Sequence, residues 1–252
     1  MIDVQNLTMH YGSFIALDDI SFCVREGEIL GLLGPNGAGK TTAMRILTTY
    51  LYPTSGTATI DSLDILEHPV EVRKRIGYLP ETAPLYLDMQ TEEYLQFVAE
   101  ARGVRGKKLS SRLGWVRDAC GIKPIWKHTL SEISKGYRQR VGLAQALIHD
   151  PKVLIFDEPT SGLDPLQIIG IRDLIRRLAK EKTIIFSTHI LQEVEVMADR
   201  IVIINEGKIV SQGTQEELAN QVRATSETKQ DLNLEDIFIA LLTKGKKEKV
   251  RV

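Results

Sequence analysis

Residues Gly34–Thr42 read GPNGAGKTT and match the pattern G-x-x-x-x-G-K-[ST], which is suited to nucleotide phosphates. The glycines let successive backbone N–H groups turn towards bound phosphates. Lys40 would supply a positive charge to the β- and γ-phosphates, and the Thr41 hydroxyl would be a ligand for Mg²⁺. A plain glycine-rich turn is the alternative interpretation. The residues predicted to bind the nucleotide here are Gly34, Pro35, Asn36, Gly37, Ala38, Gly39, Lys40, Thr41 and Thr42.

Two carboxylates and a histidine follow later in the chain, each at the end of an apolar run. Residues 153–158 read VLIFDE, and in a phosphate site Asp157 would hold Mg²⁺ while Glu158 would accept a proton from the attacking water. His189 ends the run KTIIFSTH and could contact the γ-phosphate, because parallel sheets bind ligands at the carboxyl ends of their strands. We predict Lys40, Glu158 and His189 as catalytic residues. A solvent-facing acid pair and a structural histidine are the alternatives.

A second group suited to an anion lies in residues 131–147, which read SEISKGYRQRVGLAQAL. Ser134 and Gly136 stand at the start of an expected helix. Free backbone N–H groups, a hydroxyl and the positive end of the helix dipole favour negative charge there. We predict that both residues bind phosphate, which leaves the chain with two phosphate-binding elements far apart in the sequence.

Two kinds of strand must position these residues. Apolar runs typical of strands buried on both faces occur at residues 28–33, 153–156, 183–186 and 201–204. Helical spacing at Thr41–Leu51 and Ile171–Glu181 separates such runs, which predicts an α/β fold with a P-loop core and a mostly parallel sheet. Alternating segments, which predict an antiparallel β subdomain, occur at Ile2–Tyr11, Ala16–Arg25 and Thr57–Ile60.

Helical patterns replace strand patterns between Pro84 and Leu130. Two amphipathic stretches, Thr91–Arg102 and Leu109–Cys120, predict a helical subdomain inserted into the α/β core. Near the end of the chain a helix with one apolar face is expected, packed either on its own core or on a partner. That face is formed by Leu234, Ile237, Phe238, Leu241 and Leu242, and the basic residues 244–251 follow it.

The composition is that of an ordinary globular protein, since 43% of the 252 residues are hydrophobic and 26% are charged. A net charge of −1 gives no overall attraction to nucleic acid or to anionic membranes. The two cysteines predict no disulfide framework. The N-terminus MIDVQNLTMH is not typical of a secretory signal, and no apolar run reaches about 18 residues, so we expect a cytoplasmic location.

In their order along the chain, these motifs resemble the ATP-binding subunit of an ABC transporter. The similarity extends from Tyr11 to about Gly213. Besides the P-loop it is carried by the aromatic Tyr11, a Q-loop-like GYLPE at Gly77–Glu81, the signature at Ile133–Tyr137, the pair Asp157–Glu158, the D-loop SGLDP at Ser161–Pro165 and the switch histidine His189. GYLPE together with SKGYRQRVGLAQAL is similar to ATPase subunits of bacterial exporters, whose membrane half is a separate polypeptide.

The resemblance implies an ATPase that uses ATP and Mg²⁺ and dimerises with a second copy or a homologous subunit. Ser134 and Gly136 of one copy would cover the ATP held by Lys40 and Thr41 of the other. In the signature the family usually has Leu-Ser-Gly-Gly-Gln, so lysine and tyrosine here replace the first glycine and the glutamine.

The resemblance also assigns roles to two residues outside the P-loop. Tyr11 would stack on the adenine, although a core aromatic at a strand end is the alternative. Glu81 stands where the family usually has glutamine, and its carboxylate would contact Mg²⁺, directly or through water.

The expected domain organisation and partners follow from the same resemblance. Residues 1–220 would form the ABC ATPase domain, with the helical subdomain at about 84–135, and residues 221–252 a short C-terminal helix and basic tail. Integral membrane permease subunits would contact Glu81–Tyr94 and hold the protein at the cytoplasmic face of the membrane. The alternative function is an ABC-type ATPase acting on nucleic acid or ribosomes, but we expect no nucleic-acid partner. The transported substrate is not encoded in this chain.

Overall fold

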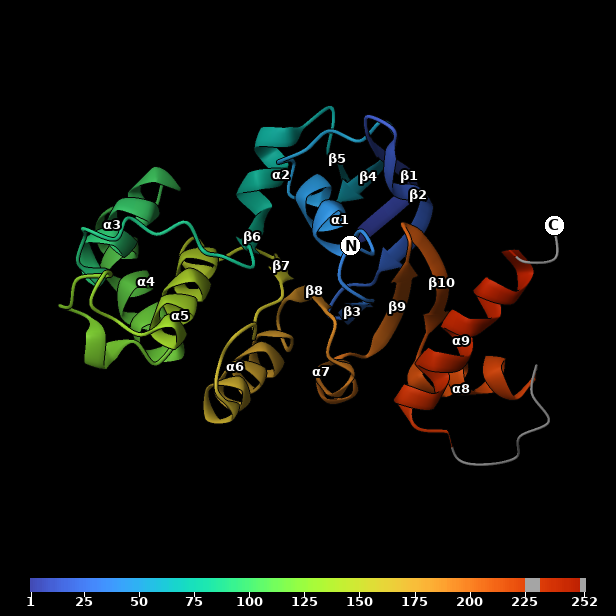
Figure 1. The fold of residues 1–252 in the computed structure, drawn as a ribbon. Coiled ribbons are helices and arrows are strands. Elements are labelled where there is room, and N and C mark those ends of the chain that lie inside the picture. Colours follow the sequence, from blue (N-terminus) through green and yellow to red (C-terminus); the bar gives the residue numbers. More distant parts are fainter. Residues whose placement is uncertain (225–231, 250–252) are drawn as a thin grey trace.

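The computed structural model describes residues 1–224 and 232–249, which form two sheets and a set of surrounding helices (Figure 1). The smaller sheet has the strand order β2-β1-β4-β5, and its strands pair antiparallel. Its strands are β1 (Ile2–Tyr11), β2 (Phe14–Val24), β4 (Ser55–Ile60) and β5 (Leu63–Asp64). The predicted antiparallel β subdomain is confirmed, and β2 begins earlier than predicted because Phe14 already pairs with Tyr11 across a tight turn.

The larger sheet has the strand order β10-β9-β3-β8-β7-β6. Its strands are β3 (Ile29–Leu33), β6 (Ile76–Leu79), β7 (Val153–Asp157), β8 (Thr183–Thr188), β9 (Arg200–Asn205) and β10 (Lys208–Gly213). All neighbours pair in parallel except β10, which is antiparallel to β9. The mostly parallel sheet is therefore confirmed, while the two edge strands β6 and β10 were not predicted.

The larger sheet is covered on both faces, and successive residues of its strands enter two different cores. In β3, Leu30 and Leu32 pack in the core shared with the smaller sheet, whereas Ile29 and Leu33 pack in the opposite core. Because side chains alternate between the faces of a strand, both sets must be apolar. This double burial explains why these strands read as continuous apolar runs.

The helices differ in which face of the larger sheet they cover. The helix α1 (Lys40–Leu47) packs in the core between the two sheets, and the others described are α2 (Pro69–Arg75), α3 (Thr91–Ala101), α4 (Gly106–Ala119), α5 (Lys135–Leu147), α6 (Pro165–Leu178), α7 (Leu191–Met197), α8 (Gln215–Arg223) and α9 (Leu234–Lys249). The helices α3 and α4 correspond to the two helical stretches predicted for the inserted subdomain, and α5 gathers with them at one side of the molecule, away from the smaller sheet (Figure 1).

The start of α6 differs from the sequence prediction, which placed this helix at Ile171–Glu181. The helix begins at Pro165 because the side chain of Asp164 accepts a hydrogen bond from the backbone N–H of Gln167. A proline in the first helical position needs no hydrogen-bond partner for its nitrogen. The helix α6 therefore begins at the last residue of the D-loop, Pro165.

The C-terminal helix α9 packs on the same core as the helices before it. Leu234, Ile237 and Leu241 are buried there, so the described part of its apolar face is covered by the chain itself. The expected boundary at residue 220 falls inside α8, and α9 continues to Lys249; residues 250–252 of the expected tail lie outside the described residues. Within the described residues no helix has both the length and the apolar character needed to cross a membrane.

Candidate nucleotide-binding and catalytic site

The P-loop joins β3 to α1, and close backbone contacts fix its shape. Gly39 has a φ of 106°, and a Cβ atom there would lie 2.4 Å from the carbonyl oxygen of Ala16. Only glycine fits such a position without moving the neighbouring strand. The Nζ of Lys40 donates hydrogen bonds to the carbonyl oxygens of Gly34 (2.9 Å) and Pro35 (3.1 Å), so the side chain folds back over the loop.

Asp157 stands at the end of β7 and joins the P-loop to β8. Its Oδ1 accepts hydrogen bonds from Thr41 Oγ1 (3.1 Å) and Ser187 Oγ (2.6 Å). Its Oδ2 is buried and has no hydrogen-bond partner among the residues that the structure describes. An unpartnered carboxylate oxygen is costly inside a protein, so this corner is suited to a cation. Ser187 was not predicted from the sequence.

The metal ligands that the chain supplies are few. Across residues 1–224 and 232–249 no group of three or more His, Cys, Asp or Glu residues could hold a metal ion. Mg²⁺ commonly takes one or two protein ligands and completes its shell with water and substrate phosphates. Thr41 and Asp157 fit that pattern. Glu81 lies on the exposed loop after β6 and lines the pocket that Lys40 and Thr41 also line.

Tyr78 on β6 borders this corner. Burial, and to a lesser extent the negative charge of Asp157, raises the pKa of Tyr78 to about 12. The phenol therefore stays protonated at neutral pH and adds no negative charge beside Asp157.

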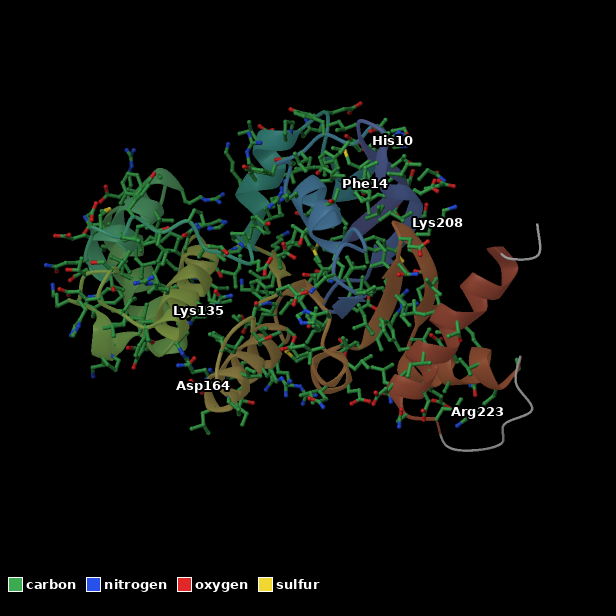
Figure 2. The ribbon with its side chains drawn as sticks, in the orientation of Figure 1. His10, Phe14, Lys135, Asp164, Lys208 and Arg223 are labelled. Carbon is green, nitrogen blue, oxygen red and sulfur yellow. The ribbon has the colours of Figure 1, made fainter. Side chains whose placement is uncertain are left out.

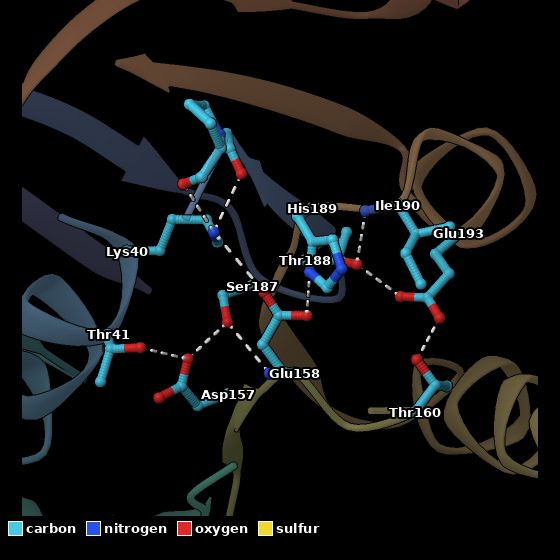
Figure 3. A network of polar contacts seen from close by, with 12 residues as sticks. Lys40, Thr41, Asp157, Glu158, Thr160, Ser187, Thr188, His189, Ile190 and Glu193 are labelled. Carbon is cyan, nitrogen blue, oxygen red and sulfur yellow. Dashed lines mark hydrogen bonds and ion pairs between the residues drawn. The ribbon is translucent and has the colours of Figure 1, made fainter. Parts of the chain in front are cut away.

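Glu158 is held in an unusual backbone conformation next to Asp157. Its φ is 49°, in the left-handed region that residues other than glycine rarely adopt, and its backbone N–H donates to Ser187 Oγ at 3.0 Å. Its carboxylate lies between two groups, 3.5 Å from Lys40 Nζ and 2.9 Å from His189 Nδ1 (Figure 3). Backbone strain of this kind is concentrated at functional sites.

A pocket of about 530 Å³ brings most of the predicted site residues together. Its lining residues are Phe14, Ala16, Asn36, Gly37, Gly39, Lys40, Thr41, Thr42, Glu81, Glu158, Ser161 and His189. Tyr11 is not among them, although it is exposed and pairs across the hairpin with Phe14. The sequence analysis missed Phe14 and Ser161, and the nearness of Phe14 to Tyr11 was the available signal.

Ser134 and Gly136 do not line this pocket. Ser134 is exposed and caps α5, its hydroxyl accepting a hydrogen bond from the N–H of Tyr137 at 3.3 Å. Gly136 is covered, since a Cβ atom there would lie 2.2 Å from Oε1 of Gln167. The labelled Lys135 marks the start of α5 in Figure 2, on the side of the molecule away from Phe14. One chain thus carries its two predicted phosphate-binding elements apart.

The P-loop, the acid pair and the histidine at the ends of parallel strands define a nucleoside-triphosphate site. A family profile described as "ABC transporter" matches residues 17–161. A second profile, described as "AAA domain, putative AbiEii toxin, Type IV TA system", matches only residues 128–195. The chain therefore belongs to the ABC transporter family, as an ATP-binding domain, and the predicted resemblance is confirmed.

Named relatives agree with this assignment. The chain is 35% identical to the probable multidrug ABC transporter ATP-binding protein YbhF of Escherichia coli K12, over 98% of this chain but only 43% of that protein. It is 38% identical to the ABC transporter ATP-binding protein NatA of Bacillus subtilis, over 91% of this chain and 92% of that protein. It is 39% identical to the bacitracin transport ATP-binding protein BcrA of Bacillus licheniformis, over 84% of this chain and 69% of that protein.

Solved structures share the fold. One described as the ATP-binding subunit of an ABC transporter has a TM-score of 0.86 and 29% identity, covering 96% of this chain and 99% of that one. The ATP-binding cassette MJ0796, in a dimeric post-hydrolysis state with ADP and Pi, has a TM-score of 0.78 and 23% identity, covering 85% and 98%. These similarities confirm the predicted P-loop fold class.

Proposed function

We propose that this protein is the ATP-hydrolysing subunit of an ABC transporter, which drives export through separate membrane permease subunits. The observation that carries the proposal is that Lys40, Thr41, Glu158 and His189 line one pocket, while Asp157 accepts a hydrogen bond from Thr41 beside it. The names of relatives in multidrug and bacitracin transport support export as the setting. The protein would then lie at the cytoplasmic face of the membrane, held there by its permease.

In this mechanism Glu158 is the general base. It accepts a proton from the water that attacks the γ-phosphorus, while the bond to the bridging oxygen of ADP breaks and phosphate is released. His189 contacts the Glu158 carboxylate at 2.9 Å and can hold it towards that water. Lys40 supplies a positive charge to the β- and γ-phosphates, for which it exchanges its present contact with Glu158.

Mg²⁺ would be held by Thr41 and Asp157, with Glu81 as a further contact. The support for this assignment is the buried Asp157 oxygen that has no hydrogen-bond partner beside the Thr41 hydroxyl. When bound, the ion would offset the negative charge of the phosphate oxygens.

The functional unit in this proposal is a dimer with two ATP molecules. Ser134 and Gly136 of one copy cover the ATP that Lys40 and Thr41 of the other copy hold. Two observations support it: Ser134 is exposed at a helix start, and neither signature residue lines the P-loop pocket of its own chain. The related cassette MJ0796 is described as dimeric.

The proposal is tested by affinity capture of the tagged chain from detergent-solubilised membranes of its source cells. We expect an integral membrane protein to co-purify in a fixed ratio, and the purified complex to hydrolyse Mg-ATP. The control is the Lys40→Ala chain, which should capture the same membrane protein without hydrolysis. Co-purification of nucleic acid or ribosomes without any membrane protein would contradict the proposal.

A further inference from the structure

A buried acid on α7 has no part in the mechanism above. Glu193 is fully buried, and its carboxylate accepts hydrogen bonds from the hydroxyls of Thr160 and of Thr188, the latter at 2.6 Å. Both threonines are themselves buried. Taking a carboxylate out of water is unfavourable unless hydrogen bonds compensate, so this contact set is specific and is not a by-product of packing.

The two threonines flank the predicted catalytic residues. Thr188 directly precedes His189 at the end of β8, and Thr160 lies two residues after Glu158 at the end of β7. Figure 3 shows Glu193 between them, on the far side of the strand ends from the contact of His189 with Glu158. Glu193 therefore joins the backbone below His189 to the loop that follows Glu158.

The direction of the hydrogen bond at Thr188 is fixed by its neighbours. The backbone N–H of Ile190 donates to Thr188 Oγ1 at 3.1 Å, and the hydroxyl in turn donates to Glu193. The residues on both sides of His189 are therefore linked to Glu193. Thr188 contacts the carboxylate directly, and Ile190 is linked to it through the Thr188 hydroxyl. The imidazole itself is 44% exposed, so its position depends on the backbone beneath it more than on packing around the ring.

The loop after Glu158 is also held from the opposite side. The Nε2 of Gln139 on α5 donates to the carbonyl oxygen of Pro159 at 3.0 Å, and both groups are buried. Pro159 and Thr160 are thus fixed between α5 and α7.

We infer that Glu193 is a positioning residue for ATP hydrolysis: by bridging Thr160 and Thr188 it keeps His189 within contact of Glu158. The inference rests on the proposed roles of Glu158 and His189. Glu193 is buried and does not line the P-loop pocket, so its loss should lower kcat and leave ATP binding unchanged.

The test compares kcat and the KM for ATP in four variants of the same purified complex. Glu193→Ala removes both contacts, Glu193→Gln keeps the shape and hydrogen-bonding capacity, and Thr160→Val removes one hydroxyl at constant volume. Glu195→Ala is the matched control, because Glu195 is exposed on the same helix. Thermal melting of each variant shows that it is folded at the assay temperature.

We expect kcat of Glu193→Ala to fall about tenfold or more with KM within about twofold, since small displacements of catalytic groups cost rates of this order. Glu193→Gln should recover most of kcat, Thr160→Val should lose part of it, and Glu195→Ala should match the wild type. If Glu193→Ala does not fold, Thr160→Val decides.

The inference is overturned by a wild-type kcat in Thr160→Val or in folded Glu193→Ala. It is also overturned by equal losses in the Ala and Gln variants of Glu193, or by a rise in KM that accounts for the loss of activity. Glu158→Gln is measured in parallel. A variant of Glu158 that still turns over ATP contradicts the proposed mechanism, whereas an inactive one beside a normal Glu193→Ala contradicts only this inference.

Discussion

The two predicted phosphate-binding elements of this chain are built in opposite ways. At the P-loop, Lys40, Asp157 and Glu158 are buried and hold one another or the surrounding loop through several hydrogen bonds. At the start of α5, Ser134 is exposed, and its hydroxyl accepts the hydrogen bond that caps its own helix. The first element contains two carboxylates and a lysine, whereas the second has a hydroxyl and backbone N–H groups.

In the proposed mechanism this difference corresponds to two tasks, the chemistry in one copy and the closure of the site by the other. A catalytic centre needs groups fixed in advance, because reorganisation during the reaction costs rate. A surface that covers a neighbour's nucleotide needs only donors that are free until the neighbour arrives. The predictions below test this division of labour.

The largest effect is expected from Glu158→Gln. The amide cannot accept the proton of the attacking water, so turnover of Mg-ATP should fall by about a hundredfold or more, while ATP binding persists. ATP-dependent dimers should then accumulate in size-exclusion chromatography. Glu216→Gln, on the exposed face of α8, is the control and should behave as wild type. A Glu158→Gln variant that stays monomeric in saturating Mg-ATP would contradict the proposal that the two elements meet in an ATP-dependent dimer.

A smaller effect is expected from Ser134→Ala, and Thr214→Ala provides a matched control. Both residues cap a helix through their hydroxyls, so each substitution should cost about 1 kcal/mol of stability. Only Ser134→Ala should also weaken ATP-dependent dimerisation and lower turnover, because only Ser134 is proposed to face a neighbour's phosphate. Analytical ultracentrifugation with ATP measures this. Equal behaviour of the two variants would show that Ser134 is only a cap.

The next prediction concerns which aromatic residue at the end of the first hairpin contacts the ATP bound at the P-loop. Phe14 lines the pocket and Tyr11 does not, so we expect Phe14→Ala to raise the Kd for ATP by about fivefold or more, as loss of a stacked ring does. Tyr11→Ala should have the smaller effect. The binding of a fluorescent ATP analogue measures both. A larger effect at Tyr11 would restore the role assigned from the family resemblance.

The last prediction concerns stability and not turnover, and it involves His149, which lies just beyond the end of α5 and contacts β6. Its Nε2 lies 3.0 Å from the carbonyl oxygen of Ile76, and burial lowers the pKa of His149 to about 4. The neutral ring is favoured in the folded state, so this stabilisation is complete above pH 6.5 and is lost as the pH falls towards 4. The loss should approach about 3 kcal/mol.

Urea unfolding at a series of pH values tests the role of His149. The free energy of unfolding of His149→Gln should fall less steeply than that of wild type between pH 6.5 and 4. Identical slopes in the two proteins would show that the ring does not carry this pH dependence.

Local patterns were enough to predict the centre of the fold and much of the site. Strands such as β7 are buried on both faces, which makes them continuous apolar runs, and the glycine-rich loop must keep its glycines for steric reasons. The edge strands β6 and β10 were missed because each is short or half polar. The start of α6 could have been found from Asp164 and Pro165, which form a recognisable helix start.

The contacts around the predicted catalytic residues could not be derived from the sequence. Ser187 supports Asp157, and Glu193 joins Thr160 to Thr188, across separations that leave no periodic signal in the sequence. Which residues become partners depends on which strand ends lie side by side, and therefore on the strand order of the sheet. Phe14 was missed for a related reason, since its place at the pocket depends on how the hairpin turns.

In the proposed dimer, the hydrogen bond from Gln139 to Pro159 has a mechanical consequence. The helix α5 begins at Ser134, which is proposed to face the neighbouring copy. Further along the same helix, Gln139 donates a hydrogen bond to the carbonyl oxygen of Pro159, next to the proposed general base Glu158. If this helix swings as two copies approach or separate, the Pro159 peptide must travel with it or the hydrogen bond must break. In the proposed dimer, either response would transmit the state of one pocket to the other without any change in the bound nucleotide there.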